Sequence, residues 1–205
     1  AAETRLGRTL PETLLRVATS DKDDQMDETR FYALIRRVCE PAAVADRHVR
    51  AILESVFLSS CENADSAPRI RLLMAMAMFC EGSKSAKLSF GFYMLCDEVR
   101  TSLVHVEEIA ELLRAVLVTV FTLAKEVLDE ELADFIQTVA GALADDMASF
   151  LGKHELEFED LAAWYNARGH DRAPWIDLLD LSKWLPYESD AAPLHGQDEA
   201  EWLEE

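Results

Sequence analysis

One stretch of the sequence, residues 81–113, has the pattern of two amphipathic helices joined by a loop of twelve residues. Leu88, Phe92 and Leu95 have the i, i+4, i+7 spacing of a buried helical face. After the loop, a second apolar face begins at Ile109 and continues along the following helix. A helix–loop–helix unit cannot bury both faces by itself, so this stretch requires further units to pack against.

The same pattern occurs four times, at residues 10–39, 46–80, 86–124 and 131–166. The twelve-residue loops are predicted at 19–30, 63–74, 96–107 and 149–160, each with an apolar residue at its eighth position. We expect neighbouring loops to meet through short strand contacts, which would join the units in pairs. The predicted contacts pair Met26 with Ile70 and Leu103 with Leu156.

The predicted fold is all-α, with four such units in two lobes, at residues 10–80 and 86–166. Only 7 glycines and 6 prolines occur, half of the residues are hydrophobic, and strand-type alternation is scarce. Beyond the lobes, residues 173–185 are predicted to form an amphipathic helix. The acidic tail at 186–205 has few apolar residues, and we expect it to be disordered.

The negative charge is concentrated in the second half of the chain. Residues 1–100 contain 14 Lys+Arg and 15 Asp+Glu, a net charge of −1, whereas residues 101–205 contain 6 and 24, a net charge of −18. This argues against binding to nucleic acid or to an anionic membrane. The acidic surface either aids solubility or faces a basic partner surface.

The cysteines Cys39, Cys61, Cys80 and Cys96 are widely spaced, include no C-x-x-C pair, and lie mostly on or next to apolar helical segments. We therefore expect reduced, buried thiols in a cytosolic protein. No signal peptide and no run of 18 apolar residues is present, so a cytoplasmic protein without a membrane span is predicted. The chain starts at Ala1 rather than at methionine, which leaves open a fragment, a trimmed product or a terminal lipid signal.

No pattern of an enzyme is found. The five histidines lack the spacing of a zinc site, and neither a glycine-rich phosphate loop nor a G-x-S-x-G motif occurs. We therefore predict a non-catalytic protein without a cofactor.

The residues Glu81-Gly82-Ser83, Ala86-Lys87-Leu88 and Phe90 to Met94 resemble the linker and third-hand helix of the neuronal calcium sensors, in the EF-hand superfamily. This resemblance implies four EF-hands in two lobes, calcium switching, and a hydrophobic groove that takes a target helix. The series Phe158, Trp164, Pro174-Trp175 is also similar to EF-hand-like regions that precede TLDc domains, whose loops are degenerate.

The loops lack the ligands that an EF-hand uses for calcium, namely oxygens at positions one, three and five, glycine at six and glutamate at twelve. The central loop has Cys96, Glu98, Arg100 and Thr101 at the first four of these positions and Glu107 at the twelfth. Loop 63–74 has alanine at position five, proline at six and methionine at twelve. Loop 149–160 has leucine at position three and lysine at five.

Loop 19–30 is the richest in oxygen atoms, but Arg30 replaces its twelfth ligand. No metal site is therefore predicted. If calcium binds at all, the candidate ligands are Thr19, Asp21, Asp23 and Gln25.

The favoured hypothesis is a calcium-independent interaction or scaffold module. It would bind an amphipathic helix or a basic surface of a partner protein, and a component of the cytoskeleton is one candidate partner. The alternatives are a calcium sensor with atypical loops and a regulatory domain of a larger protein.

The methionine-rich helix after residue 71 would line either a groove or the core. The candidate groove residues are Met74, Met78, Phe92, Leu113, Val116, Leu117, Val120 and Phe121. Residues 173–185 would form a lid or a partner-binding helix, through Trp175, Leu178, Leu179 and Trp184.

Overall fold

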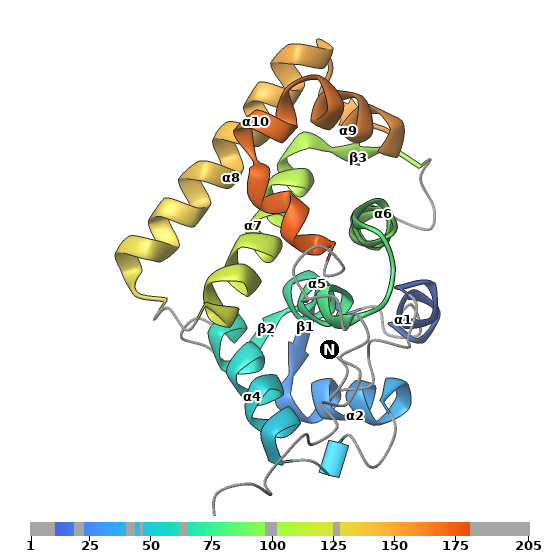
Figure 1. The fold of residues 1–205 in the computed structure, drawn as a ribbon, viewed down its shortest axis with the longest axis vertical. Helices are drawn as coiled ribbons and strands as arrows, with labels where there is room; N and C mark the ends of the chain where they lie inside the picture. Colours follow the sequence, from blue (N-terminus) through green and yellow to red (C-terminus); the bar gives the residue numbers. More distant parts are fainter. Residues whose placement is uncertain are drawn as a thin grey trace, which may run out of the picture.

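The computed structural model describes residues 11–18, 23–39, 44–45, 47–61, 65–96, 102–124 and 128–180. This part of the chain is mainly helical, with two short antiparallel sheets of two strands each (Figure 1). The prediction of an all-α protein is thus confirmed at the level of fold class. No helix among the described residues is long and apolar enough to cross a membrane.

The first half has two helix–strand–helix segments. Their elements are α1 (Pro11–Ala18), β1 (Gln25–Asp27), α2 (Glu28–Val38), α4 (Arg47–Cys61), β2 (Ser66–Pro68) and α5 (Arg69–Phe79). Pro11 begins α1, where a missing N–H costs no helical hydrogen bond. Asp27 caps α2 by accepting a hydrogen bond from the Arg30 N–H at 2.8 Å.

The second half repeats this order and then adds a short extension. It contains α6 (Lys84–Leu95), β3 (Val104–His105), α7 (Val106–Leu123), α8 (Glu130–Leu151), β4 (Glu155–Leu156) and α9 (Phe158–Trp164). A π-helical turn (Tyr165–Gly169), α10 (His170–Arg172) and a 3-10 helix (Pro174–Leu179) follow. The acidic run from Asp129 starts α8, and the Asp129 carboxylate accepts a hydrogen bond from the Leu132 N–H at 2.9 Å.

The strands pair as expected, but in a different register. Met26 lies opposite Ala67 instead of Ile70, and Leu156 lies opposite Val104 instead of Leu103. The proline after Ala67 disfavours helical geometry there, so the chain stays extended and α5 begins only at Arg69. Ile70 therefore lies in the first turn of α5. The second difference is a shift of one residue, which exchanges the inward and outward faces of a strand.

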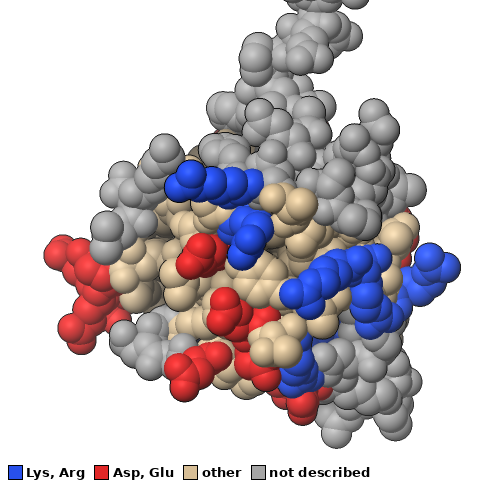
Figure 2. All heavy atoms as spheres, turned by 90° about the horizontal axis from the view of Figure 1, so that it is seen from below, with Lys and Arg blue, Asp and Glu red and all other residues tan. Residues whose placement is uncertain are grey.

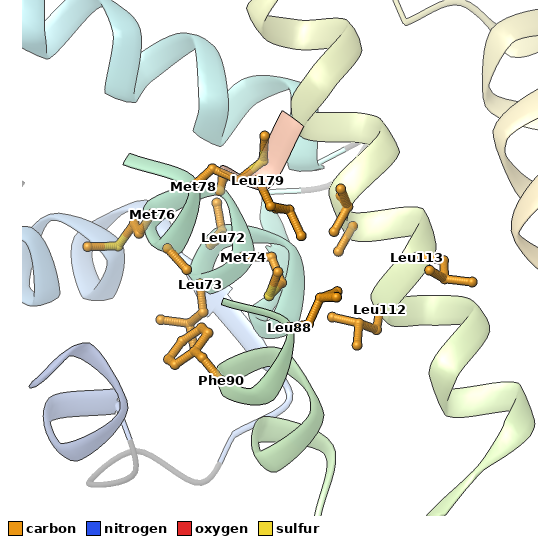
Figure 3. Packing of buried hydrophobic residues seen from close by; sticks show 14 of the residues in the cluster. Leu72, Leu73, Met74, Met76, Met78, Leu88, Phe90, Leu112, Leu113 and Leu179 are labelled. Carbon is orange, nitrogen blue, oxygen red and sulfur yellow. The ribbon is translucent and has the colours of Figure 1, made fainter. Parts of the chain in front are cut away.

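Helix α5 forms the centre of the molecule. It packs against α1, α4, α6 and α7, and every residue from Arg71 to Met78 is buried. Figure 3 shows Met74 of α5, Leu88 of α6 and Leu112 of α7 pointing towards one another. Gly91 permits this approach, because a Cβ there would lie 2.4 Å from a Leu112 methyl carbon and 2.6 Å from the Met74 sulfur. The methionine-rich helix is therefore core.

Helix α8 lies antiparallel beside α7 and buries a narrow apolar stripe. Ile136, Leu143 and Met147 are buried, whereas Leu132 and Val139 are only partly buried. Phe135 is 54% exposed. It precedes Ile136 by one residue, which turns its side chain by about 100° around the helix.

Candidate functional site

In the loop that ends at Arg30, the guanidinium of this residue contacts oxygen atoms of the same loop. The Arg30 side chain forms an ion pair with Asp23 at 2.8 Å and donates a hydrogen bond to the Gln25 carbonyl at 3.1 Å. Asp23 is the fifth residue of this loop, Gln25 the seventh and Arg30 the twelfth. These are positions that supply calcium ligands in a functional EF-hand loop. Thr19 and Asp21, the other candidate ligands, lie outside the described residues.

The loop between α8 and α9 has the same ion pair with the charges exchanged. Lys153, at position five, lies 2.6 Å from the carboxylate of Asp160, at position twelve. The same carboxylate accepts a hydrogen bond from the Glu157 N–H at 2.8 Å. Burial acts to raise the pKa of Asp160, but the hydrogen bonds from Lys153 and from the Glu157 N–H outweigh it and hold that pKa below its usual value.

Both loops therefore join positions five and twelve through an internal cation. A divalent ion entering either loop would have to displace the guanidinium of Arg30 or the ammonium of Lys153. Within the described ranges, no group of three or more His, Cys, Asp or Glu side chains could hold a metal ion.

The strand register also changes the numbering of the central loop. With Val104 at the eighth position, the loop covers residues 97–108, so Glu108 rather than Glu107 is twelfth. The Glu108 carboxylate accepts a hydrogen bond from the His105 N–H at 2.8 Å, as in a helix capping box. Asp97 then becomes the first residue, and the apolar Val99 stands at the third. Residues 97–101 lie outside the described part of the chain.

The residues predicted to line a partner groove are packed inside the protein instead. Their burial follows from the central position of α5, which α6 and α7 cover. Val120 and Phe121 are partly buried, and Phe121 packs against a cluster formed by Leu117, Val118 and Ile136. The buried members of the predicted groove are Met74, Met78, Phe92, Leu113, Val116 and Leu117.

A cleft of about 660 Å³ lies elsewhere, between α4, α7 and the start of α8. Its apolar lining includes Val118 and Ile136, together with Leu58, whose side chain is 62% exposed. The sequence pattern did not single out this cleft. Leu58 and the carboxylates at the start of α8 lie about 70 residues apart in the sequence, and no sequence pattern connects them. The remaining lining residues are Ser59, Arg114, Leu128, Asp129, Glu130, Ala133, Asp134 and Gln137.

The described part of the segment after α10, residues 173–180, packs onto the protein. Ile176 and Leu179 are buried, and Trp175 and Leu178 are partly buried. The described helix is a 3-10 helix of six residues rather than an amphipathic α-helix. Trp184 and the acidic tail at 186–205 lie outside the described residues.

An ion pair fixes this 3-10 helix to α6. The Lys84 ammonium lies 2.5 Å from the Asp177 carboxylate, which also accepts a hydrogen bond from the Tyr165 hydroxyl at 3.0 Å. Lys84 stands 4.0 Å above the centre of the Tyr165 ring. Burial lowers the pKa of Lys84, but its bonds to Asp177 and Tyr165 outweigh burial and raise the pKa above its ordinary value.

No model of a known protein family matches the sequence, and no curated protein or solved structure is significantly similar to the chain. The function must therefore be inferred from the geometry of the chain itself.

Proposed function

We propose that this chain is a non-catalytic, calcium-independent interaction module built on an EF-hand-like plan. Support for the plan comes from the order of the elements. Four helix–strand–helix segments follow one another, and their strands pair first with second and third with fourth. Paired EF-hands join their loops through short antiparallel strands in the same way.

The observation that carries calcium independence is the ion pair between positions five and twelve in two loops. In an EF-hand these positions hold oxygen ligands around a divalent cation. Here Arg30 and Lys153 provide positive charge at those positions. Such a loop keeps its local charge balance without a metal, so the module would hold one conformation at any calcium concentration.

The decisive test is a calorimetric calcium titration of the full chain, with tryptophan fluorescence recorded in parallel. We expect no binding heat and no fluorescence change up to millimolar calcium. Heat at micromolar calcium would overturn the proposal and favour a sensor. A Glu108→Gln variant would then show whether the central loop, with Asp97 first and Glu108 twelfth, is responsible.

The role of Arg30 can be tested by restoring the missing ligand. We predict that Arg30→Glu gives loop 19–30 a measurable calcium affinity, with a dissociation constant on the order of 10⁻⁴–10⁻³ M, as in weak EF-hand sites. Arg36→Glu makes the same change of charge at an exposed position on α2 and should show no heat. Equal heats from both variants would contradict a specific role for Arg30.

A further inference from the structure

The cleft between α4, α7 and α8 has an apolar floor and an acidic rim. Val118 and Ile136 form part of the floor and belong to a small buried cluster. Leu58 stands at the side of the cleft with 62% of its surface in water. A single exposed leucine is ordinary on a protein surface, but one beside a cleft with an apolar floor can be covered by a docked side chain.

The charges around the cleft are predominantly negative. Asp129, Glu130 and Asp134 line it, and all three are exposed. Among the described residues that line it, Arg114 is the cationic one; its side chain is 17% exposed and lies 3.6 Å from Glu111. Figure 2, which views the molecule from the side of α2 and α4, shows one group of acidic side chains at the left edge and others across the middle of the face, next to basic side chains. An incoming segment therefore meets an acidic rim before it reaches the apolar floor.

We infer that this cleft binds an amphipathic helix of a partner protein whose polar face carries lysine or arginine. The inference rests on the proposed role as an interaction module and names its docking site and its class of partner. Leucine-type side chains on one face of the helix would pack against the exposed Leu58, above the buried Val118 and Ile136. Cations on the flanks of that helix would face Glu130 and Asp134.

The chain's own acidic tail is a poor occupant of the same cleft. Residues 186–205 contain 7 Asp+Glu and no Lys or Arg, so like charges would meet at the rim. A basic helix has the opposite sign. The complementarity of charge therefore favours an external basic partner over the tail.

The test uses the full chain in calcium-free buffer and two fluorescent model peptides. One is a helical peptide of about eighteen residues, with leucines at i, i+3, i+4 and i+7 and lysines elsewhere. The other has glutamate in place of every lysine. In fluorescence anisotropy, we expect the lysine peptide to bind at least about tenfold more tightly than the glutamate peptide, and to bind more weakly as salt is added.

Two variants with matched controls localise the binding. Leu58→Asp should weaken binding of the lysine peptide about tenfold, and Asp134→Lys about three- to tenfold. Phe150→Asp places the same acid at another exposed aromatic or aliphatic position, near the far end of α8. Asp145→Lys repeats the change of net charge at an exposed position of α8 outside the cleft. Both controls should bind within about twofold of the wild type, and thermal melts should show that all variants fold.

Each outcome bears on one proposal. If the wild type binds no lysine peptide, or if the cleft variants and their controls bind equally, the docking site is wrong while the calcium-independent module stands. If the peptide binds only when calcium is added, the proposed function fails instead. If sedimentation shows a dimer that Leu58→Asp dissociates, the cleft joins two copies of this chain and the external partner is ruled out.

Discussion

The four cysteines are free thiols that the fold shields to different extents. Cys39, Cys61 and Cys80 are buried, and Cys96 at the end of α6 is partly exposed. Burial raises the pKa of Cys39 to about 11 and that of Cys80 to about 12. The Cys80 thiol also donates a hydrogen bond to the Met76 carbonyl at 3.4 Å. Because the thiolate is the reactive form, Cys39 and Cys80 should react orders of magnitude more slowly than an ordinary exposed thiol.

We predict that a thiol reagent at about pH 8 modifies Cys96 first and leaves Cys39 and Cys80 unmodified until the protein unfolds. With a pKa of about 12, Cys80 has a thiolate fraction on the order of 10⁻⁴ at that pH, in addition to being inaccessible. Peptide mapping by mass spectrometry after short labelling would give the order. Early labelling of Cys80 in the folded protein would show that α5 is less well covered than its burial indicates.

The charge reversal at Arg30 could be predicted from the sequence, because the spacing of loop 19–30 already placed a cation at the twelfth position. The contacts of Arg30 could not be predicted, because the conformation of the loop decides whether its guanidinium turns inward to Asp23 or outward to solvent. Lys153 is similar. The sequence put it at the fifth position of its loop, and only the structure brings it to Asp160 at the twelfth.

The two glycines inside long helices have opposite surroundings. A Cβ on Gly91 in α6 would overlap Leu112 and Met74, both of which are completely buried. A Cβ on Gly141 in α8 would meet no atom within 4 Å. The same substitution should therefore have opposite effects at the two positions.

We predict that Gly91→Ala destabilises the protein by about 1–3 kcal/mol, because overpacking of this core outweighs the gain in helix propensity. Gly141→Ala should stabilise it by about 0.5–1 kcal/mol, through reduced freedom of the unfolded chain. Urea unfolding followed by circular dichroism would measure both. A stabilising Gly91→Ala would mean that α6 can move away from α5 and α7.

At the scale of elements, periodicity predicted where the helices are but not how the strands align. The apolar residue at the eighth position was identified correctly in the first and fourth loops. In the second loop the spacing put Ile70 at the eighth position. Pro68 keeps Ala67 in an extended conformation, so Ala67 is the residue that pairs with Met26, and Ile70 lies in α5. A pattern of apolar side chains contains no information on such backbone restrictions. The predicted strand register differs from the structure by three residues in the sheet of β1 and β2, and by one residue in the sheet of β3 and β4.

Across the whole molecule, the 3-10 helix Pro174–Leu179 connects the end of the described chain to α6 and α7. Its polar attachment is the contact of Asp177 with Lys84 and with the Tyr165 hydroxyl. The buried side chains of Ile176 and Leu179 provide the apolar part. Lys84 directly follows the Glu81-Gly82-Ser83 linker, but nothing in the sequence pattern connected it to a residue 93 positions later.

We predict that Asp177→Asn lowers the free energy of unfolding by about 1–2 kcal/mol near neutral pH. The pKa of Lys84 is raised in the folded protein, so the stability from this contact is fully present below the ordinary lysine pKa of 10.5 and is lost as the pH rises through the folded value. The difference in stability between wild type and Asp177→Asn should therefore shrink at strongly alkaline pH.

Urea titrations at neutral and alkaline pH would measure this difference. Asp145→Asn removes a carboxylate from an exposed position of α8 and serves as the control, with little effect expected at either pH. An Asp177→Asn difference that does not change with pH would show that the side chain acts through packing rather than through the charge of Lys84.

Helix α5 belongs by sequence to the first half of the molecule, yet α6 and α7 of the second half complete its burial. One buried cluster includes side chains from both halves. The short linker after α5 contains Gly82, which has a φ of 127°. In the sequence this linker looks like a boundary between two lobes, but the buried core continues across it. A gene divided at that linker would encode two pieces that each expose a large part of this core. Such pieces could recover the native packing only by reassociating with each other.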